Sequence, residues 1–137
     1  MRVNYNIVLL IKHPSIDPEI ITKQIGLVPF RFWRVGAPRV TPKGTPLVGF
    51  WRESSWSWQL ACKGKRAFFE SVKNLVTELE PHHKFLSELV LSGGNLCLIV
   101  NLPGRKNIGD VLSWQLMEKM VHLNLDIGIE IFPDWAT

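Results

Sequence analysis

The sequence lacks any apolar run long enough to cross a bilayer. Its longest apolar stretches, Ile7–Ile11 and Leu96–Val100, have the length of a β-strand, whereas a membrane-spanning helix needs about 20 residues. Polar residues interrupt the first positions, Met1–Asn6, where a signal peptide would carry its apolar segment. We therefore expect a cytoplasmic protein that makes no contact with a membrane.

Cysteine is almost absent as well, since Cys62 and Cys97 are the only two. Two thiols do not make a disulfide framework, and the chain has no CxxC pair that would indicate a zinc site. Each cysteine lies in an apolar, strand-like segment. We interpret both as small buried hydrophobic residues.

The short motifs of phosphate loops, dinucleotide sites and nucleophile elbows are also missing. His13 and His122 have no sequence neighbours that indicate a catalytic triad, and the adjacent His82 and His83 point in different directions on a helix. Glu80 and His83 have the three-residue spacing of a carboxylate–histidine pair, but di-metal sites require this motif twice. We expect no enzyme activity, no catalytic residue, no metal site and no cofactor.

What the chain does have is enough apolar sequence for a core and an uneven distribution of charge. With 137 residues, 46% of them hydrophobic, we expect a single domain over residues 1–137. Residues 1–66 carry eleven Lys/Arg against three Asp/Glu, and residues 67–137 carry five against nine. The basic excess is densest between Arg31 and Arg66. Such asymmetry concerns partners rather than fold.

Hydrophobic periodicity predicts four main strands and several helices. The predicted strands are Val3–Lys12, Ser55–Cys62, Leu96–Leu102 and Leu125–Phe132. Helices are predicted between Asp17 as N-cap and Gly26 as C-terminal stop, over Ala67–Leu79, over His82–Leu91, and after a Ser113 cap. The predicted core residues include Trp56, Trp58, Leu60 and Cys62 of one strand, and Leu116, Met117, Met120 and Val121 of the last helix.

This order of elements indicates an α+β fold, a four- to five-stranded sheet with helices packed on one face. Two β-α-β-like units, joined by the central helices, make a ferredoxin-like arrangement possible. The sequence leaves the strand order open.

Residues 29–52, here called the aromatic–basic segment, differ from the rest of the chain. Four prolines and three glycines exclude a long regular element, and at most Leu47–Trp51 forms a short strand. Long connections inside compact domains are often functional. Aromatic and basic residues alternate here, and the candidate partner-binding residues are Arg31, Trp33, Arg34, Arg39, Lys43, Trp51 and Arg52.

The aromatic–basic segment has two interpretations. Its aromatic residues could close the edge of the sheet while the arginines extend into water, or the segment could form a recognition surface, because Trp and Arg dominate interface energetics. For a recognition surface, a protein partner with an acidic surface is favoured. The alternative is a nucleic acid or phosphate ligand, which uses stacking and phosphate contacts. The acidic second half and the absence of an RNP-type motif argue against that alternative.

Several stretches resemble a family of small bacterial proteins known only as a domain of unknown function. The matching stretches are Asp17–Glu19, Ile25–Leu27, Pro29, Trp33, Gly36, Lys43–Gly44, Trp56–Leu60, Leu79–Pro81, Leu112–Ser113 and Leu125–Phe132. The usual family ending, an acidic residue, an aliphatic one and tyrosine, is here Glu130-Ile131-Phe132. The family supplies no catalytic residues to transfer. The resemblance implies a cytosolic immunity protein that binds and neutralises a toxin domain.

Overall fold

The computed structural model describes residues 3–65, 67–104 and 107–132. Arg66, Arg105 and Lys106, which are among the basic residues counted above, lie outside the described residues. In chain order the elements are β1 (Val3–His13), α1 (Pro18–Ile25), β2 (Arg31–Trp33), β3 (Pro38–Val40), β4 (Pro46–Phe50), β5 (Ser54–Lys65), α2 (Phe68–Leu79), the 3-10 turn η1 (Glu80–His82), α3 (His83–Leu91), β6 (Asn95–Pro103), α4 (Trp114–His122) and β7 (Leu125–Phe132).

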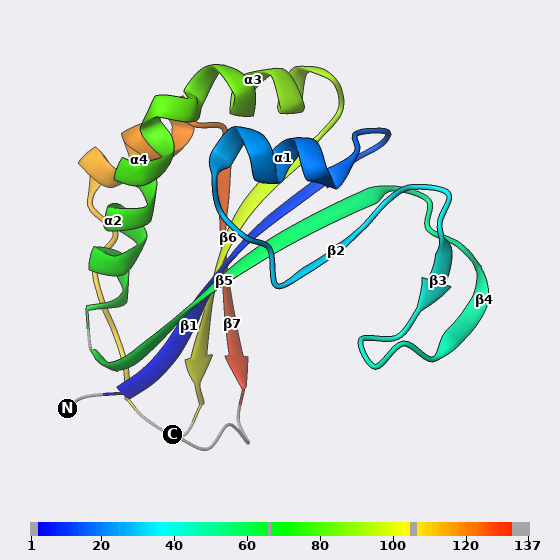
Figure 1. The fold of residues 1–137 in the computed structure, drawn as a ribbon. Coiled ribbons are helices and arrows are strands. Elements are labelled where there is room, and N and C mark those ends of the chain that lie inside the picture. Colours follow the sequence, from blue (N-terminus) through cyan, green and yellow to red (C-terminus); the bar gives the residue numbers. More distant parts are fainter. Residues whose placement is uncertain (1–2, 66, 105–106, 133–137) are drawn as a thin grey trace.

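Five strands form one mixed sheet in the order β2-β5-β1-β6-β7. Neighbouring strands are antiparallel except β6 and β7, which are parallel and are joined by α4. The helices cover one face of this sheet (Figure 1). The predicted α+β class, the five-stranded sheet and the one-sided helical layer are confirmed.

The first four strands of the large sheet follow a ferredoxin-like plan. β1, α1 and β2 form one β-α-β unit whose strands are separated by β5, and β5, α2, α3 and β6 form a second unit whose strands are separated by β1. The small sheet of β3 and β4 is inserted between β2 and β5, and α4 with β7 extends the other edge. The sequence did not indicate β2, the second strand of the first unit, because its three residues are too few for a periodic pattern.

The core lies between the helices and the central strands. Ile7, Leu9 and Ile11 of β1 are fully buried, as alternation predicts for the helix-covered face. Trp56 of β5 is also fully buried, and its indole nitrogen donates to Oγ1 of Thr22 in α1 at 3.0 Å. This bond fixes α1 over the sheet and satisfies a buried donor.

The middle of β5 is less covered than predicted. Trp56 and Cys62 are buried, whereas Trp58 is half-buried and Leu60 is exposed. All four side chains point to the helix side, since their register partners in β1 do. The strand therefore faces as predicted, but the helices do not extend over Leu60.

Helix boundaries follow the capping residues. Asp17 Oδ1 accepts from the Glu19 backbone nitrogen at 3.0 Å, and Gly26 ends α1 with a φ of 80°, which favours glycine. Ser113 Oγ accepts from the Leu116 nitrogen at 3.2 Å and begins α4. These three predicted end signals all lie where the sequence placed them.

One prediction for α4 is wrong in part. Leu116 and Met120 are buried, but Met117 and Val121 are exposed. Because α4 covers only the β7 edge of the sheet, one narrow stripe of this helix has a surface to pack on. Within the described residues, no helix combines the length and apolarity needed to cross a bilayer.

Candidate partner-binding site

The aromatic–basic segment forms one edge of the molecule. β2 pairs with β5, so that Arg31 lies opposite Ser57 and Trp33 opposite Ser55. Beyond β2 the hairpin β3–β4 stands apart from the helices, at the far side of the sheet from α2 and α4 (Figure 1). The expected short strand is present as β4, while β2 and β3 are too short for alternation to indicate them.

Backbone hydrogen bonds close the base of the hairpin, and a bond to a side chain of β5 ties it to the sheet. The Gly36 nitrogen donates to the Trp51 carbonyl at 2.8 Å, and the Trp51 nitrogen donates to the Ala37 carbonyl at 2.9 Å. The Val35 nitrogen donates to Oγ of the buried Ser54 at 3.0 Å. The segment therefore has a defined conformation despite its prolines.

Four of the predicted site residues form one continuous stack, here called the Trp–Arg stack. The Trp33 and Trp51 rings are parallel, with centroids 3.9 Å apart and 14° between their planes. The Arg31 guanidinium lies 4.7 Å from the Trp33 ring centroid, and that of Arg39 lies 5.5 Å from the Trp51 centroid. Cation–π attraction favours both contacts. The stack joins β2 of the large sheet to β3 and to Trp51, the residue that follows β4.

The other three predicted residues lie around the stack. Arg34 forms an exposed ion pair with Asp17, with Nη1 and Oδ2 3.4 Å apart. Lys43 at the hairpin turn and Arg52 after β4 are both exposed, and neither has an acidic partner among the residues that the structure describes. Both positive charges face solvent.

The structure adds apolar residues that the prediction did not include. Phe30, Phe32 and Phe50 are 57%, 56% and 65% exposed, and Val48 is 93% exposed. Phe32 alternates with Arg31 and Trp33 along β2, and this alternation was the available signal. Phe32 is the register partner of the buried Trp56 and so points to the helix side of the sheet, but the helices do not cover it at this edge.

A shallow groove of about 380 Å³ runs between β2 and the hairpin. Its lining comprises Phe30, Arg31, Phe32, Trp33, Val40, Thr41, Pro42 and Trp51. The groove combines ring faces, aliphatic carbon and guanidinium groups. This mixture suits an apolar side chain flanked by carboxylates.

Two reactive side chains outside the segment, His13 and Cys97, are at least partly buried. His13 is buried, and burial lowers its pKa; its Nδ1 accepts from the backbone nitrogens of Ser15 and Ile16 at 3.0 and 2.9 Å. Cys97 is half-buried on the helix-free face, and burial, followed by the nearby Asp126 and Glu130, raises the pKa of its thiol. A raised thiol pKa lowers the thiolate fraction and so the reactivity.

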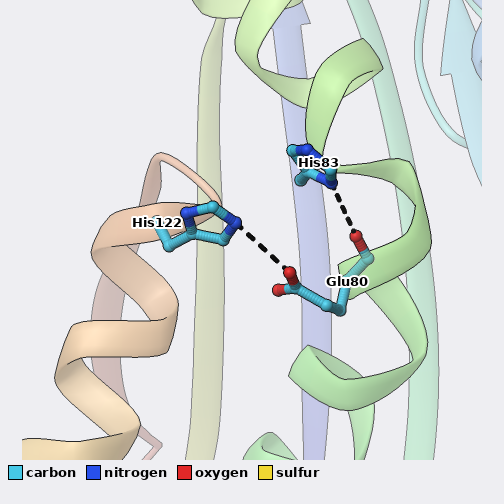
Figure 2. Close-up of side chains that lie close together, drawn as sticks. All are labelled: Glu80, His83 and His122. Carbon is cyan, nitrogen blue, oxygen red and sulfur yellow. Dashed lines mark hydrogen bonds and ion pairs between the residues drawn. The ribbon is translucent and has the colours of Figure 1, made fainter.

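One further cluster brings together residues from three helical elements (Figure 2). His122 Nε2 lies 3.2 Å from Glu80 Oε1, and His83 Nδ1 lies 3.2 Å from the Glu80 backbone oxygen. Local spacing indicated only the Glu80–His83 pair. His122 is 39 positions further along the chain than His83, so only the packing of α4 beside α2 reveals it.

Fold and site together define a ferredoxin-like α+β domain with an inserted aromatic–basic hairpin. The chain belongs to a family described as a domain of unknown function, DUF4279, whose model matches residues 3–133. No curated protein and no solved structure matches the chain.

Proposed function

We propose that this chain acts by binding a protein partner rather than by catalysis, and that the aromatic–basic segment is the contact surface. The observation that carries the proposal is the exposure of large apolar side chains on one short segment. Phe30, Phe32, Val48 and Phe50 are each more than half exposed. Phe30 and Phe32 line the same groove, and apolar surface with a polar rim is typical of interaction sites. Covering one such side chain favours association by at most about 1.5–3 kcal/mol before the costs of binding.

The charges around these side chains favour an acidic partner surface. Lys43 and Arg52 are exposed, and among the described residues Arg34 has only the half-buried Asp17 as an acidic partner. Residues 1–66 contain eleven basic against three acidic side chains. Complementary charge steers association and fixes the register of the two surfaces.

The Trp–Arg stack supports this proposal by holding the hairpin in one orientation. A surface that is already ordered loses less conformational entropy when a partner binds. Trp33 and Trp51 therefore contribute mainly by supporting the surface, and Phe32 and Phe50 by direct contact. This division refines the predicted roles of the two tryptophans.

The same stack favours protein over nucleic acid. Trp33 and Trp51 each cover one face of the other. A guanidinium also lies over each ring, that of Arg31 over Trp33 and that of Arg39 over Trp51. Single-stranded nucleic acid binds by stacking its bases on open aromatic faces. The stack therefore leaves less indole face for a base than two separate tryptophans would. Binding of nucleic acid or a phosphate ligand through residues 29–52 remains the alternative that the experiment must separate.

The more specific role that we propose is immunity, in which the chain neutralises a toxin domain by covering it. A toxin domain with an acidic surface would place carboxylates against Arg34, Arg39 and Arg52, and an apolar side chain in the groove. Neutralisation then requires no chemistry from this chain, only a complex that excludes the toxin's own substrate.

Site-specific photo-cross-linking in cells tests the binding surface. A photoreactive amino acid is placed at Phe32 or Phe50 and, as the matched control, at Leu91, which is 85% exposed on α3 outside the segment. We expect protease-sensitive, nuclease-resistant adducts from the first two positions and none from Leu91.

The other outcomes are equally decisive. Adducts that nuclease removes would establish the nucleic-acid alternative, and equal adducts from Leu91 would refute the placement of the surface. The immunity role is tested with the protein recovered in the adduct. We expect it to be toxic when expressed alone and inactive in the presence of this chain.

A further inference from the structure

We propose that Glu80, His83 and His122, here called the Glu80–His cluster, form a surface binding site for one zinc ion. Glu80 begins the turn η1, His83 begins α3, and His122 is the last residue of α4. Figure 2 shows the Glu80 carboxylate pointing toward the His122 ring, with His83 beside it. The cluster is at the β7 side of the sheet, opposite the aromatic–basic segment.

The distances suit a tetrahedral ion. With zinc–ligand bonds of about 2.0–2.2 Å, two ligand atoms on one tetrahedral zinc are about 3.3 Å apart. His122 Nε2 and Glu80 Oε1 are 3.2 Å apart. One ligand atom from each of the three residues lies within 4.8 Å of the other two. All three side chains reach solvent and can adjust to a bound ion.

Hydrogen bonding prepares His83 as a ligand. The Glu80 backbone oxygen accepts only, so Nδ1 of His83, 3.2 Å away, donates its proton to it. In the neutral ring this leaves the lone pair on Nε2. A metal-bound histidine commonly donates its other ring N–H to a carbonyl or carboxylate, which fixes the tautomer. The Glu80 backbone thus supports one ligand while its side chain supplies another.

Two imidazoles and one carboxylate match the chemistry of zinc. This set of three ligands is one that zinc uses when a fourth position stays open. The cluster adjoins a cleft of about 430 Å³ lined by Glu80 and His122 together with Val76, Thr77, Glu118 and Lys119. The open position therefore faces water and has room for a small ligand.

A plain ion pair between Glu80 and a protonated His122 is the competing explanation, and pH separates the two. The ion pair requires a charged His122 and strengthens as pH falls. Zinc requires neutral imidazoles, so its affinity falls as pH falls. Glu118 and Lys119 from α4, which line the cleft, and the adjacent His82 are the other titratable groups beside the cluster.

The rings of His83 and His122 are 5.2 Å apart, with 30° between their planes. Protonating both rings would place two like charges side by side. A single cation bound by both rings would instead be favoured by their short separation. A bound ion would also join α3 to α4. Since it binds only the folded arrangement, zinc should raise the melting temperature in a concentration-dependent way.

The experiment is a calorimetric titration of the full-length, tag-free chain with Zn²⁺ alone at pH 7.5 and pH 5.5. The variants are Glu80→Gln, His83→Gln and His122→Gln, and His82→Gln is the matched control because it removes a neighbouring histidine outside the cluster. Co²⁺ absorption reports the coordination geometry, and circular dichroism checks that each variant is folded.

We expect one Zn²⁺ per chain at pH 7.5, a rise in melting temperature, and intense tetrahedral Co²⁺ bands. Each cluster variant should lose at least about 100-fold in affinity, since even second-shell changes cost about 10–100-fold. His82→Gln should bind like wild type. The proposal is overturned if binding is not saturable at one ion, if His82→Gln is as damaging as the others, or if His122→Gln binds normally.

Discussion

Large apolar side chains are buried at the centre of the sheet but exposed on the aromatic–basic segment. On β1, Ile7, Leu9 and Ile11 are completely buried beneath the helices. On the segment, Phe32 and Phe50 are more than half exposed although they also belong to strands. The same residue types stabilise the fold where a helix covers them and remain available for contacts where an insertion extends past the helices.

Different interactions stabilise each of the two regions. Burial and dispersion stabilise the core, which unites the central strands with the helices. The hairpin β3–β4 depends instead on the Trp–Arg stack and on a few backbone hydrogen bonds, such as the one from Gly36 to Trp51. A change in one region should therefore leave the other largely intact, and the following substitutions test that separation.

The largest effect is expected from Trp56→Ala. Trp56 is fully buried and its indole nitrogen bonds Thr22, so its removal should lower the free energy of unfolding by about 3–5 kcal/mol. Trp58→Ala should cost clearly less, because Trp58 is only half-buried. Chemical denaturation of both variants measures the difference. Equal costs would mean that the helices cover both tryptophans alike.

Trp51→Ala should affect the segment far more than the core. The lost ring pair contributes about 0.5–1.5 kcal/mol beyond its buried area, so global stability should fall only modestly. Amide exchange of Gly36, whose N–H bonds the Trp51 carbonyl, should accelerate strongly, while exchange within β1 stays near wild type. A global loss as large as that of Trp56→Ala would show that the segment and the core are one cooperative unit.

Acid should weaken the core through His13. Its folded-state pKa is lowered by burial, and its Nδ1 already accepts two backbone N–H groups, so the folded protein binds the proton less readily than the unfolded chain. The stabilisation is complete above the unfolded pKa of about 6.5 and declines as pH falls from there toward the lower folded value.

The comparison for this prediction is His13→Asn, which retains an acceptor near the position of Nδ1 but does not titrate. Unfolding free energies measured from pH 7.5 down to pH 5 should fall more steeply for wild type than for the variant. Parallel curves would assign the acid sensitivity to other groups.

The smallest effect on stability is expected from Arg34→Ala. The Arg34–Asp17 pair is exposed, with 62% of the Arg34 side chain accessible, and such pairs contribute at most about 1 kcal/mol. Asp17→Ala should cost more than Arg34→Ala, because it also removes the α1 cap. Denaturation curves in low and high salt measure both, and a large cost for Arg34→Ala would assign this residue to the fold rather than to partner binding.

Sequence patterns predicted the helix-covered part of the molecule well. Asp17, Gly26 and Ser113 act locally, through backbone groups a few positions away, so the chain itself contains the signal. Alternation along β5 is also a local signal, and it correctly placed Trp56 in the core. Met117 and Val121 were misplaced because an apolar residue on a helix does not reveal how much of the sheet the helix covers.

What the sequence left open depends on contacts between distant positions. β2 becomes a strand only because β5 offers it an edge, and Trp33 meets Trp51 only after the hairpin folds back. His122 meets Glu80 only through the packing of α4 beside α2. No local spacing encodes these encounters.

One measurement tests most directly whether the aromatic–basic segment is the binding surface. The partner identified by cross-linking is purified, and its affinity is measured for the Arg52→Glu and Lys84→Glu variants of this chain. Both substitutions reverse one exposed positive charge, the first within the segment and the second on α3. We expect Arg52→Glu to weaken binding at least about tenfold, with a reduced salt dependence of association, and Lys84→Glu to stay within about twofold of wild type. Equal affinities for the two variants would contradict the assignment of the surface.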